Sequence, residues 1–155
     1  MIQPIKYQFN QRFNLPARKA YAWCTDFTPQ DPVLMREKAT REVKLITEYT
    51  IILTDKFRVE DETIIKQKLV CLYPNKLMWT STHLTGPAKH SQFIYEIKPT
   101  TRTTSKLKFT ALHLAHDLKQ GTAKNSIEQL AEELRKTDSD VWKNLAREME
   151  KEMHL

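Results

Sequence analysis

The chain has 155 residues, a formal net charge of +6 and an isoelectric point near 9.3. A chain of this length buries about 68–70% of its unfolded surface and needs no disulfide or metal to hold a core. Only two glycines occur, which excludes the glycine-rich phosphate loops of nucleotide-binding proteins. No stretch of about 18 apolar residues and no signal-peptide core occurs, so we expect one cytoplasmic domain, 1–155.

The first predicted element is a strand over residues 5–15, because apolar and polar side chains alternate there with a period of two. Its inner positions are Ile5, Tyr7, Phe9, Gln11, Phe13 and Leu15. Pro16 ends the strand and suits the first turn of a short helix over 16–27. A second short helical stretch is expected in 28–35, where Pro29 and Pro32 permit at most a turn or two.

Residues 40–116 predict six strands of an antiparallel meander, separated by regularly spaced turns. The turns fall near Glu48, 59–61, 74–75, 86–87 and 99–103. The period of two predicts one apolar inner face, formed by Ile65, Gln67, Leu69, Cys71, Trp79, Ser81, His83, Phe93, Tyr95, Ile97, Leu107, Phe109, Ala111 and His113. The alternate positions, predicted to face solvent, are Lys66, Lys68, Lys98, Lys106 and Lys108.

The end of the chain predicts two helices. In 137–155 the apolar residues recur at helical spacing, and Thr137 with Asp140 resembles a capping box at the start. The apolar stripe is formed by Val141, Trp142, Leu145, Ala146, Met149 and Met153. A separate helix is predicted over Ser126–Arg135, and 137–139 is expected to break it from the last one.

The order is therefore one strand, two short helices, six strands and a long helix. With LPAR (15–18) opening the first helix and VWKNLAREMEKE (141–152) near the end, this order resembles the START-like, or SRPBCC, helix-grip superfamily. That superfamily includes birch-allergen-like proteins and polyketide cyclases, and the resemblance spans essentially the whole chain.

The resemblance implies an α+β fold in which a curved seven-stranded antiparallel sheet wraps around the C-terminal helix and leaves a hydrophobic cavity between them. The chain departs from the superfamily pattern in two places. The glycine-rich loop often found between the second and third strands is replaced by a turn at 47–49, and the helix at 126–135 is additional.

A small apolar ligand in that cavity is the leading functional hypothesis, because large apolar side chains with a few polar groups are typical of ligand pockets. The predicted walls are Trp79, Tyr95, Phe109, Trp142, Leu145 and Met149, and the predicted polar contacts are His83 and His113. The alternative for each of these residues is a place in a filled core. No nucleophile or carboxylate is positioned beside either histidine by spacing, so no catalytic residue is assigned.

No metal or other cofactor is predicted. His113 and His116 are three apart, and on a strand such positions point to opposite faces. The acidic run 60–62 reads as an exposed turn. The basic outer face lacks the aromatic stacking platform that single-stranded nucleic acids need, so no nucleic-acid partner is expected.

Three classes of function therefore remain: a binding module for a lipid-like or polyketide-like molecule, a cyclase or hydrolase using His83, His113 or Tyr95 as acid or base, and a chaperone-activator-like domain that binds a protein partner. A wide cavity favours the first two classes, and a filled interior favours the third.

Overall fold

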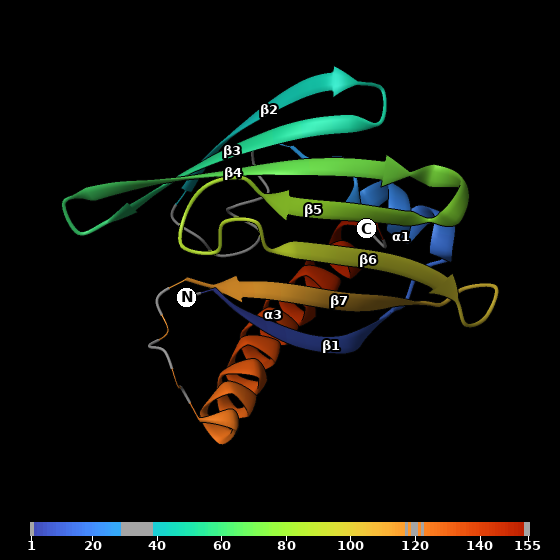
Figure 1. Ribbon diagram of the computed structural model, residues 1–155. Helices are drawn as coiled ribbons and strands as arrows, with labels where there is room; N and C mark the ends of the chain where they lie inside the picture. Colours follow the sequence, from blue (N-terminus) through green and yellow to red (C-terminus); the bar gives the residue numbers. More distant parts are fainter. Residues whose placement is uncertain (1, 29–38, 117, 119–120, 122, 154–155) are drawn as a thin grey trace.

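The structure is a computed structural model that describes residues 2–28, 39–116, 118, 121 and 123–153. Its centre is a seven-stranded sheet in which every neighbouring pair is antiparallel, in the order β1-β7-β6-β5-β4-β3-β2 (Figure 1). The strands are β1 Gln3–Phe13, β2 Ala39–Thr47, β3 Thr50–Val59, β4 Glu62–Tyr73, β5 Met78–His83, β6 Gln92–Pro99 and β7 Ser105–Ala115. The predicted strand order and turn positions are confirmed.

In the described part of the chain, two α-helices lie on one face of the sheet (Figure 1). The first, α1 Ala17–Cys24, follows Pro16, whose ring fixes φ near the helical value at the start of the helix. A 3-10 turn, η1 Pro74–Lys76, joins β4 to β5. The second short helix predicted in 28–35 falls almost wholly on residues outside the described part of the chain.

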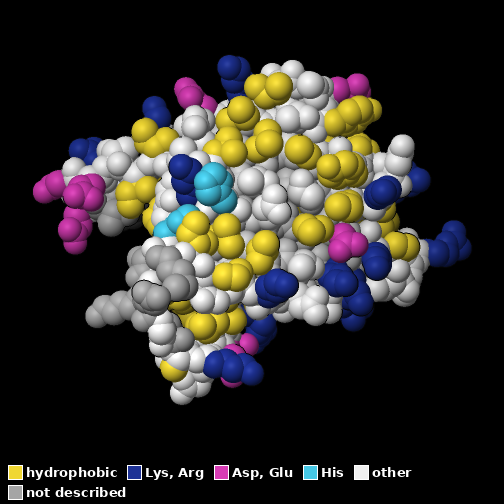
Figure 2. Space-filling model, viewed as in Figure 1, with side chains coloured by type: hydrophobic (Ala, Val, Ile, Leu, Met, Phe, Trp, Pro, Cys, Tyr) yellow, Lys and Arg dark blue, Asp and Glu magenta, His cyan; other side chains and the backbone are white. Residues whose placement is uncertain are grey.

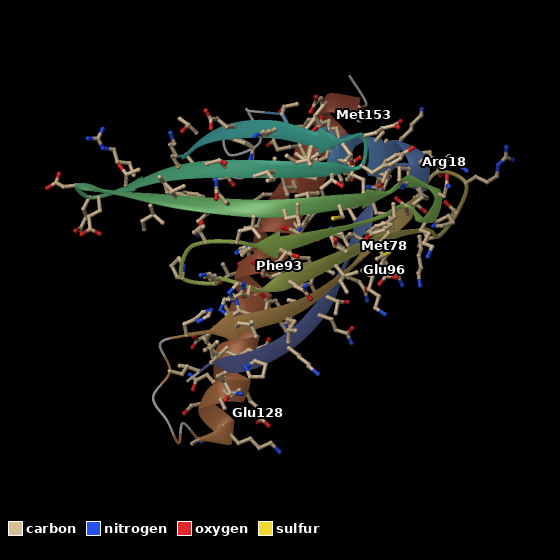
Figure 3. The ribbon with its side chains drawn as sticks, turned by 45° about the horizontal axis from the view of Figure 1, so that its top comes forward. Arg18, Met78, Phe93, Glu96, Glu128 and Met153 are labelled. Carbon is tan, nitrogen blue, oxygen red and sulfur yellow. The ribbon has the colours of Figure 1, made fainter. Side chains whose placement is uncertain are left out.

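The last helix, α3 Lys124–Met153, is continuous. Figure 3 shows it crossing the strands from the Glu128 end to Met153, near α1. The predicted break at 137–139 and the predicted capping box are therefore wrong. The Thr137 hydroxyl donates to the Glu133 carbonyl one turn back, 3.0 Å away, and so does not cap a new helix. The additional segment 126–135 is the first part of the same helix.

The inner face of β1, β5, β6 and β7 was predicted in the correct register. Residues on this face that were predicted to be inner, such as Phe9, Trp79, Phe93 and Phe109, are buried. Register pairs connect them across the sheet, since Trp79 lies opposite Tyr95, Tyr95 opposite Phe109 and Phe109 opposite Phe9. Burial of large apolar side chains along these rows supplies most of the driving force for folding.

The predicted register of β4 is wrong by one residue. Val70 is 1% exposed and pairs with the buried Ser81, so the inner positions of β4 are Lys66, Lys68, Val70 and Leu72. The predicted inner residues Ile65, Gln67, Leu69 and Cys71 face outward. A slip of one residue exchanges the two faces of a strand, and it brings two lysines to the interior.

The outer face of the sheet is less basic than predicted. Lys98 and Lys106 are exposed and Lys108 is half-buried, but Ile52 and Leu69 pair with each other on the same face. Figure 2 shows hydrophobic side chains over β2 to β5 on this face and a group of Lys and Arg side chains over the part that β7 and β1 form. None of the helices in the described part is long and apolar enough to cross a membrane.

Candidate functional site

A cavity of about 560 Å³ lies between the inner face of the sheet and the two helices. Figure 3 labels Phe93 on the part of β6 that crosses α3, over this space. The described residues on its wall come from β2 to β7, from α1 and the residues after it, and from α3. They are Trp23, Cys24, Asp26, Phe27, Thr28, Arg41, Leu53, Lys66, Lys68, Val70, Trp79, Ser81, His83, Phe93, Tyr95, Phe109, Asp138, Val141, Trp142, Leu145 and Glu152.

Part of the cavity surface consists of packed rings, here called the aromatic wall: Trp79, Phe93, Tyr95, Phe109 and Trp142. The rings of Trp79 and Tyr95 stack with centroids 4.5 Å apart and planes 3° from parallel. Trp142 of α3 lies against both, at 6.2 and 5.8 Å. Such contacts hold the rings in fixed positions, so this part of the cavity wall is apolar and already in place.

The part of the inner face next to the aromatic wall is polar and is here called the charged corner: Arg41, Asp55, Lys66, Lys68 and His83. The register of β2 to β5 assembles it, because Arg41 lies opposite Asp55, Asp55 opposite Lys66, and Lys68 opposite His83. Cross-strand partners are close enough to interact directly. Four strands therefore bring together residues that are up to 42 positions apart in the sequence.

Asp55 is the anchor of the charged corner. Arg41 donates to both of its carboxylate oxygens, with Nε 2.7 Å from Oδ1 and Nη2 2.9 Å from Oδ2, and Lys68 Nζ lies 3.4 Å from Oδ2. The side chains of Arg41 and Asp55 are only 6% and 2% exposed. Burial alone would raise the pKa of Asp55, but the Arg41 hydrogen bond and the Lys68 charge outweigh it and hold the pKa below its usual value.

Lys66 has a different environment from its neighbours. Its ammonium lies over the ring of Phe57, 4.8 Å from the centroid. The ion pairs between described residues include Lys68 but not Lys66. Lys66 is half-buried, and part of its side chain lines the cavity.

His83 is a neutral group in this setting. Burial, followed by the charges of Lys68 and Lys66, lowers its pKa to about 3. At pH 7 the imidazole therefore carries one N–H donor and one acceptor nitrogen without a charge. Its ring contacts Phe93, with centroids 4.9 Å apart, and so joins the charged corner to the aromatic wall.

Asp138 of α3 adds a carboxyl group to the wall. The Tyr7 hydroxyl donates a hydrogen bond to its Oδ2. Burial raises the pKa of Asp138, while the Tyr7 hydrogen bond and the charge of Lys68 lower it by less. Burial, the Asp138 charge and the hydrogen bond to it also raise the pKa of the Tyr7 hydroxyl, which stays protonated at neutral pH.

No protein-family model and no curated protein matches the sequence. Several solved structures match the fold over nearly the whole chain. The Zhui aromatase/cyclase from Streptomyces sp. R1128 has a TM-score of 0.75 and 11% identity, with 99% of this chain and 96% of that chain covered. A START superfamily protein from Mycobacterium smegmatis has a TM-score of 0.68, 11% identity and coverages of 93% and 98%.

The chain has the START-like helix-grip fold. Norcoclaurine synthase from Thalictrum flavum, solved in complex with dopamine and hydroxybenzaldehyde, shares this fold as well, with a TM-score of 0.66, 11% identity and coverages of 95% and 88%. The α+β prediction of a curved sheet with a long C-terminal helix is thereby confirmed, and the helix-grip arrangement explains where the cavity lies.

Within this helix-grip fold, six of the eight predicted site residues lie on the cavity wall: Trp79, His83, Tyr95, Phe109, Trp142 and Leu145. The other two do not. Met149 is fully buried in the core beside α1, and His113 is half-buried on β7, opposite Ile5. Four of the six are on β5, β6 and β7, whose register was predicted correctly, and Trp142 and Leu145 are on α3.

Sequence analysis predicted His83 but missed the charged side chains on the cavity wall at Arg41, Lys66, Lys68 and Asp138, and the buried Asp55 beside them. One signal was present in the sequence. Asp55 lies between Leu53 and Phe57 on the inner parity of its strand, and aspartate is depleted in strands. Asp55 lies on the same inner face of its strand as Ile51 and Leu53, so its carboxylate requires a cation beside it. The nearest cations on the inner face are those of β2 and β4.

Proposed function

We propose that the protein binds a small amphipathic molecule in the cavity between the sheet and α3. The observation that carries this proposal is the cavity itself, since about 560 Å³ falls in the usual range for small-molecule sites, roughly 300–1,000 Å³. A domain core is packed close to crystal density and leaves few voids larger than a water molecule. A space of this size in a domain of this length is therefore better explained as a binding site than as a packing defect.

The chemistry of the wall supports an amphipathic ligand with a flat apolar body. The stacked pair of Trp79 and Tyr95 and the tilted ring of Trp142 line the cavity with aromatic side chains. Polar side chains are confined to a few positions on the wall, which is how pockets orient a ligand. The norcoclaurine synthase that shares the fold holds two small aromatic molecules in its solved structure, which is consistent with this class of ligand.

The alternative of an enzyme that uses His83 as its base is less well supported. A general base works best when its pKa lies near the working pH, and the pKa of His83 is lowered to about 3. His113 lies off the wall. The alternative of a protein-interaction domain was tied to a filled interior, and the cavity argues against that condition.

The direct test is a thermal-shift panel of fatty acids, sterols, quinones and aromatic polyketides. A ligand present at about 100 times its dissociation constant should stabilise the fold by roughly 2.7 kcal/mol. Val141→Trp should abolish the shift, because Val141 is a half-buried residue of α3 on the cavity wall and a larger side chain there fills the space.

Lys143→Trp is the matched control, since it places the same side chain on the exposed side of the same helix. It should bind every ligand that the unaltered protein binds. A panel in which no compound raises the melting temperature of the unaltered protein would contradict the proposal. So would a ligand whose shift survives in Val141→Trp.

A further inference from the structure

Asp138 of α3 lines the cavity with one carboxylate oxygen still available. The Tyr7 hydroxyl donates to Oδ2, whereas Oδ1 takes part in none of the hydrogen bonds and ion pairs between described residues. In the part of the chain that the structure describes, every enclosed side-chain N or O atom has a hydrogen-bond partner. Since Oδ1 has none, it must reach open space, and the open space that Asp138 lines is the cavity.

The Tyr95 hydroxyl is in the same situation. The Tyr95 ring contacts Trp79 at 4.5 Å and Trp142 at 5.8 Å, but its hydroxyl forms no hydrogen bond with a described residue. It therefore also reaches the cavity, which Tyr95 lines. Burial and then the charge of Asp138 raise the pKa of this hydroxyl. The carboxylate and the hydroxyl thus lie near each other without a direct hydrogen bond between them.

The helix fixes the place of the carboxylate relative to the aromatic wall. Asp138 and Trp142 are four residues apart on α3, so their side chains project from the same face of the helix, about 6 Å apart along its axis. Trp142 in turn lies against Trp79 and Tyr95. The carboxylate of Asp138 is therefore beside the aromatic rings, where the polar group of a bound aromatic molecule would lie.

A desolvated acceptor without a donor costs free energy, and a hydrogen bond to a charged acceptor is stronger than one between neutral groups. We propose that Asp138 Oδ1 accepts a hydrogen bond from a hydroxyl group of the ligand, and that Tyr95 donates one to the oxygen of the same hydroxyl. Tyr7 acts as a positioning residue, because it holds Oδ2. This inference rests on the proposed function and names the chemical class of its ligand.

A neutral hydroxyl suits this place better than an ammonium group, although both donate to a carboxylate. The charge of Lys68 acts on Asp138 and counteracts part of the rise in its pKa that burial causes. Lys66 contributes to the same cavity wall. Charges of the same sign repel a cationic ligand at short range. The ligand that we infer is therefore a phenol or an aromatic alcohol whose ring lies against the aromatic wall.

The test uses three probes with the same ring system: naphthylmethanol, its methyl ether and naphthylmethylamine. Each is titrated into the full chain at pH 7 by calorimetry. The alcohol and the ether share an acceptor oxygen, but only the alcohol donates a hydrogen bond. We expect the alcohol to bind about tenfold tighter than the ether, as a hydrogen bond to a charged group provides, and tighter than the amine.

Two variants separate the roles of the carboxylate and the hydroxyl. Asp138→Asn should abolish the preference for the alcohol, because the amide oxygen keeps the Tyr7 hydrogen bond and an N–H donor replaces the Oδ1 acceptor. Tyr95→Phe should weaken the alcohol and the ether alike, about fivefold, because both oxygens accept from Tyr95.

Matched controls make the same substitutions away from the cavity. Asp140→Asn changes an exposed carboxylate two residues further along the same helix, and Tyr49→Phe removes the hydroxyl of a 48% exposed tyrosine. Both should leave the affinities for all three probes unchanged. Val141→Trp should abolish the binding of each probe, which locates the probes in the cavity.

Each failure has a different meaning. An ether that binds in the cavity as tightly as the alcohol overturns the hydroxyl inference and leaves the proposed function standing. A preference for the alcohol that persists in Asp138→Asn overturns the assignment to Asp138, and an amine that binds tighter than the alcohol overturns the choice of a neutral ligand. Absence of binding by all three probes overturns the inference, while the thermal-shift panel tests the proposed function independently.

Discussion

The aromatic wall and the charged corner occupy the same face of the same sheet, but different forces maintain them. The aromatic wall gains stability from the burial of its own side chains, since Trp79 is only 3% exposed. The charged corner includes an ion pair between almost fully buried side chains. Replacing such a pair by apolar residues is often neutral or stabilising, so stability alone does not explain why the charges are there. The comparison separates a part of the cavity wall whose burial stabilises the fold from a part whose charges are not explained by stability.

Asp55→Ala should have the largest effect on stability. A small effect would contradict the comparison drawn between the charged corner and the aromatic wall. The substitution leaves the buried Arg41 guanidinium without its bidentate partner, which costs about 3–5 kcal/mol when one member of a buried pair is removed. Denaturant titration measures the loss. Asp61→Ala, in the exposed β3–β4 turn, is the control and should stay within about 0.5 kcal/mol of the unaltered protein.

Trp79→Ala should come next, with a loss of about 3 kcal/mol in the free energy of unfolding. A buried tryptophan loses its transfer free energy and leaves a cavity, but part of this ring already borders open space, so the loss should lie at the low end of the usual range. Tyr73→Ala, at a 45% exposed position of β4, should change stability by only about 0.5 kcal/mol. A Trp79→Ala loss as small as that of Tyr73→Ala would show that the aromatic wall does not support the fold.

Asp138→Asn should have the smallest effect and the opposite sign. Burial raises the pKa of this carboxyl in the folded state. The protonated carboxyl therefore contributes stability that is fully present below the unfolded pKa, about 3.9, and that is lost as the pH rises through the folded pKa. The asparagine has no such loss, and its amide oxygen can still accept the Tyr7 hydrogen bond. The melting temperature of Asp138→Asn should therefore rise relative to that of the unaltered protein between pH 3 and pH 7. A variant that is less stable at pH 7 than the unaltered protein contradicts this sign.

The same two regions differ in how well sequence predicted them. The aromatic wall follows from a period of two in β5, β6 and β7, where large apolar residues occupy one parity and polar residues the other. In β4 both parities are apolar, since Leu69, Val70, Cys71 and Leu72 are consecutive. The choice of face then depended on two lysines, which were assigned to solvent because charged residues are rarely buried.

The partner that brings those lysines inward is on another strand. Asp55 of β3 lies opposite Lys66 and forms an ion pair with Lys68, and such a pairing depends on the register of β3 against β4, which β4 alone does not determine. The break predicted at 137–139 failed for a related reason. Asp138 is a cap-forming residue type by local rules, but its carboxylate is engaged by Tyr7, which is 131 positions away in the sequence.

The pairing of β1 with β7 also sets an order of events during synthesis. Phe9 lies opposite Phe109, exactly 100 positions later, and at about 5–20 residues per second the ribosome needs roughly 5–20 s to produce that partner. During this interval the apolar side of β1 has neither β7 nor α3 to cover it. Its other side carries Lys6, Gln8, Asn10 and Arg12, which hydrate the waiting strand and reduce its tendency to pair with other nascent chains.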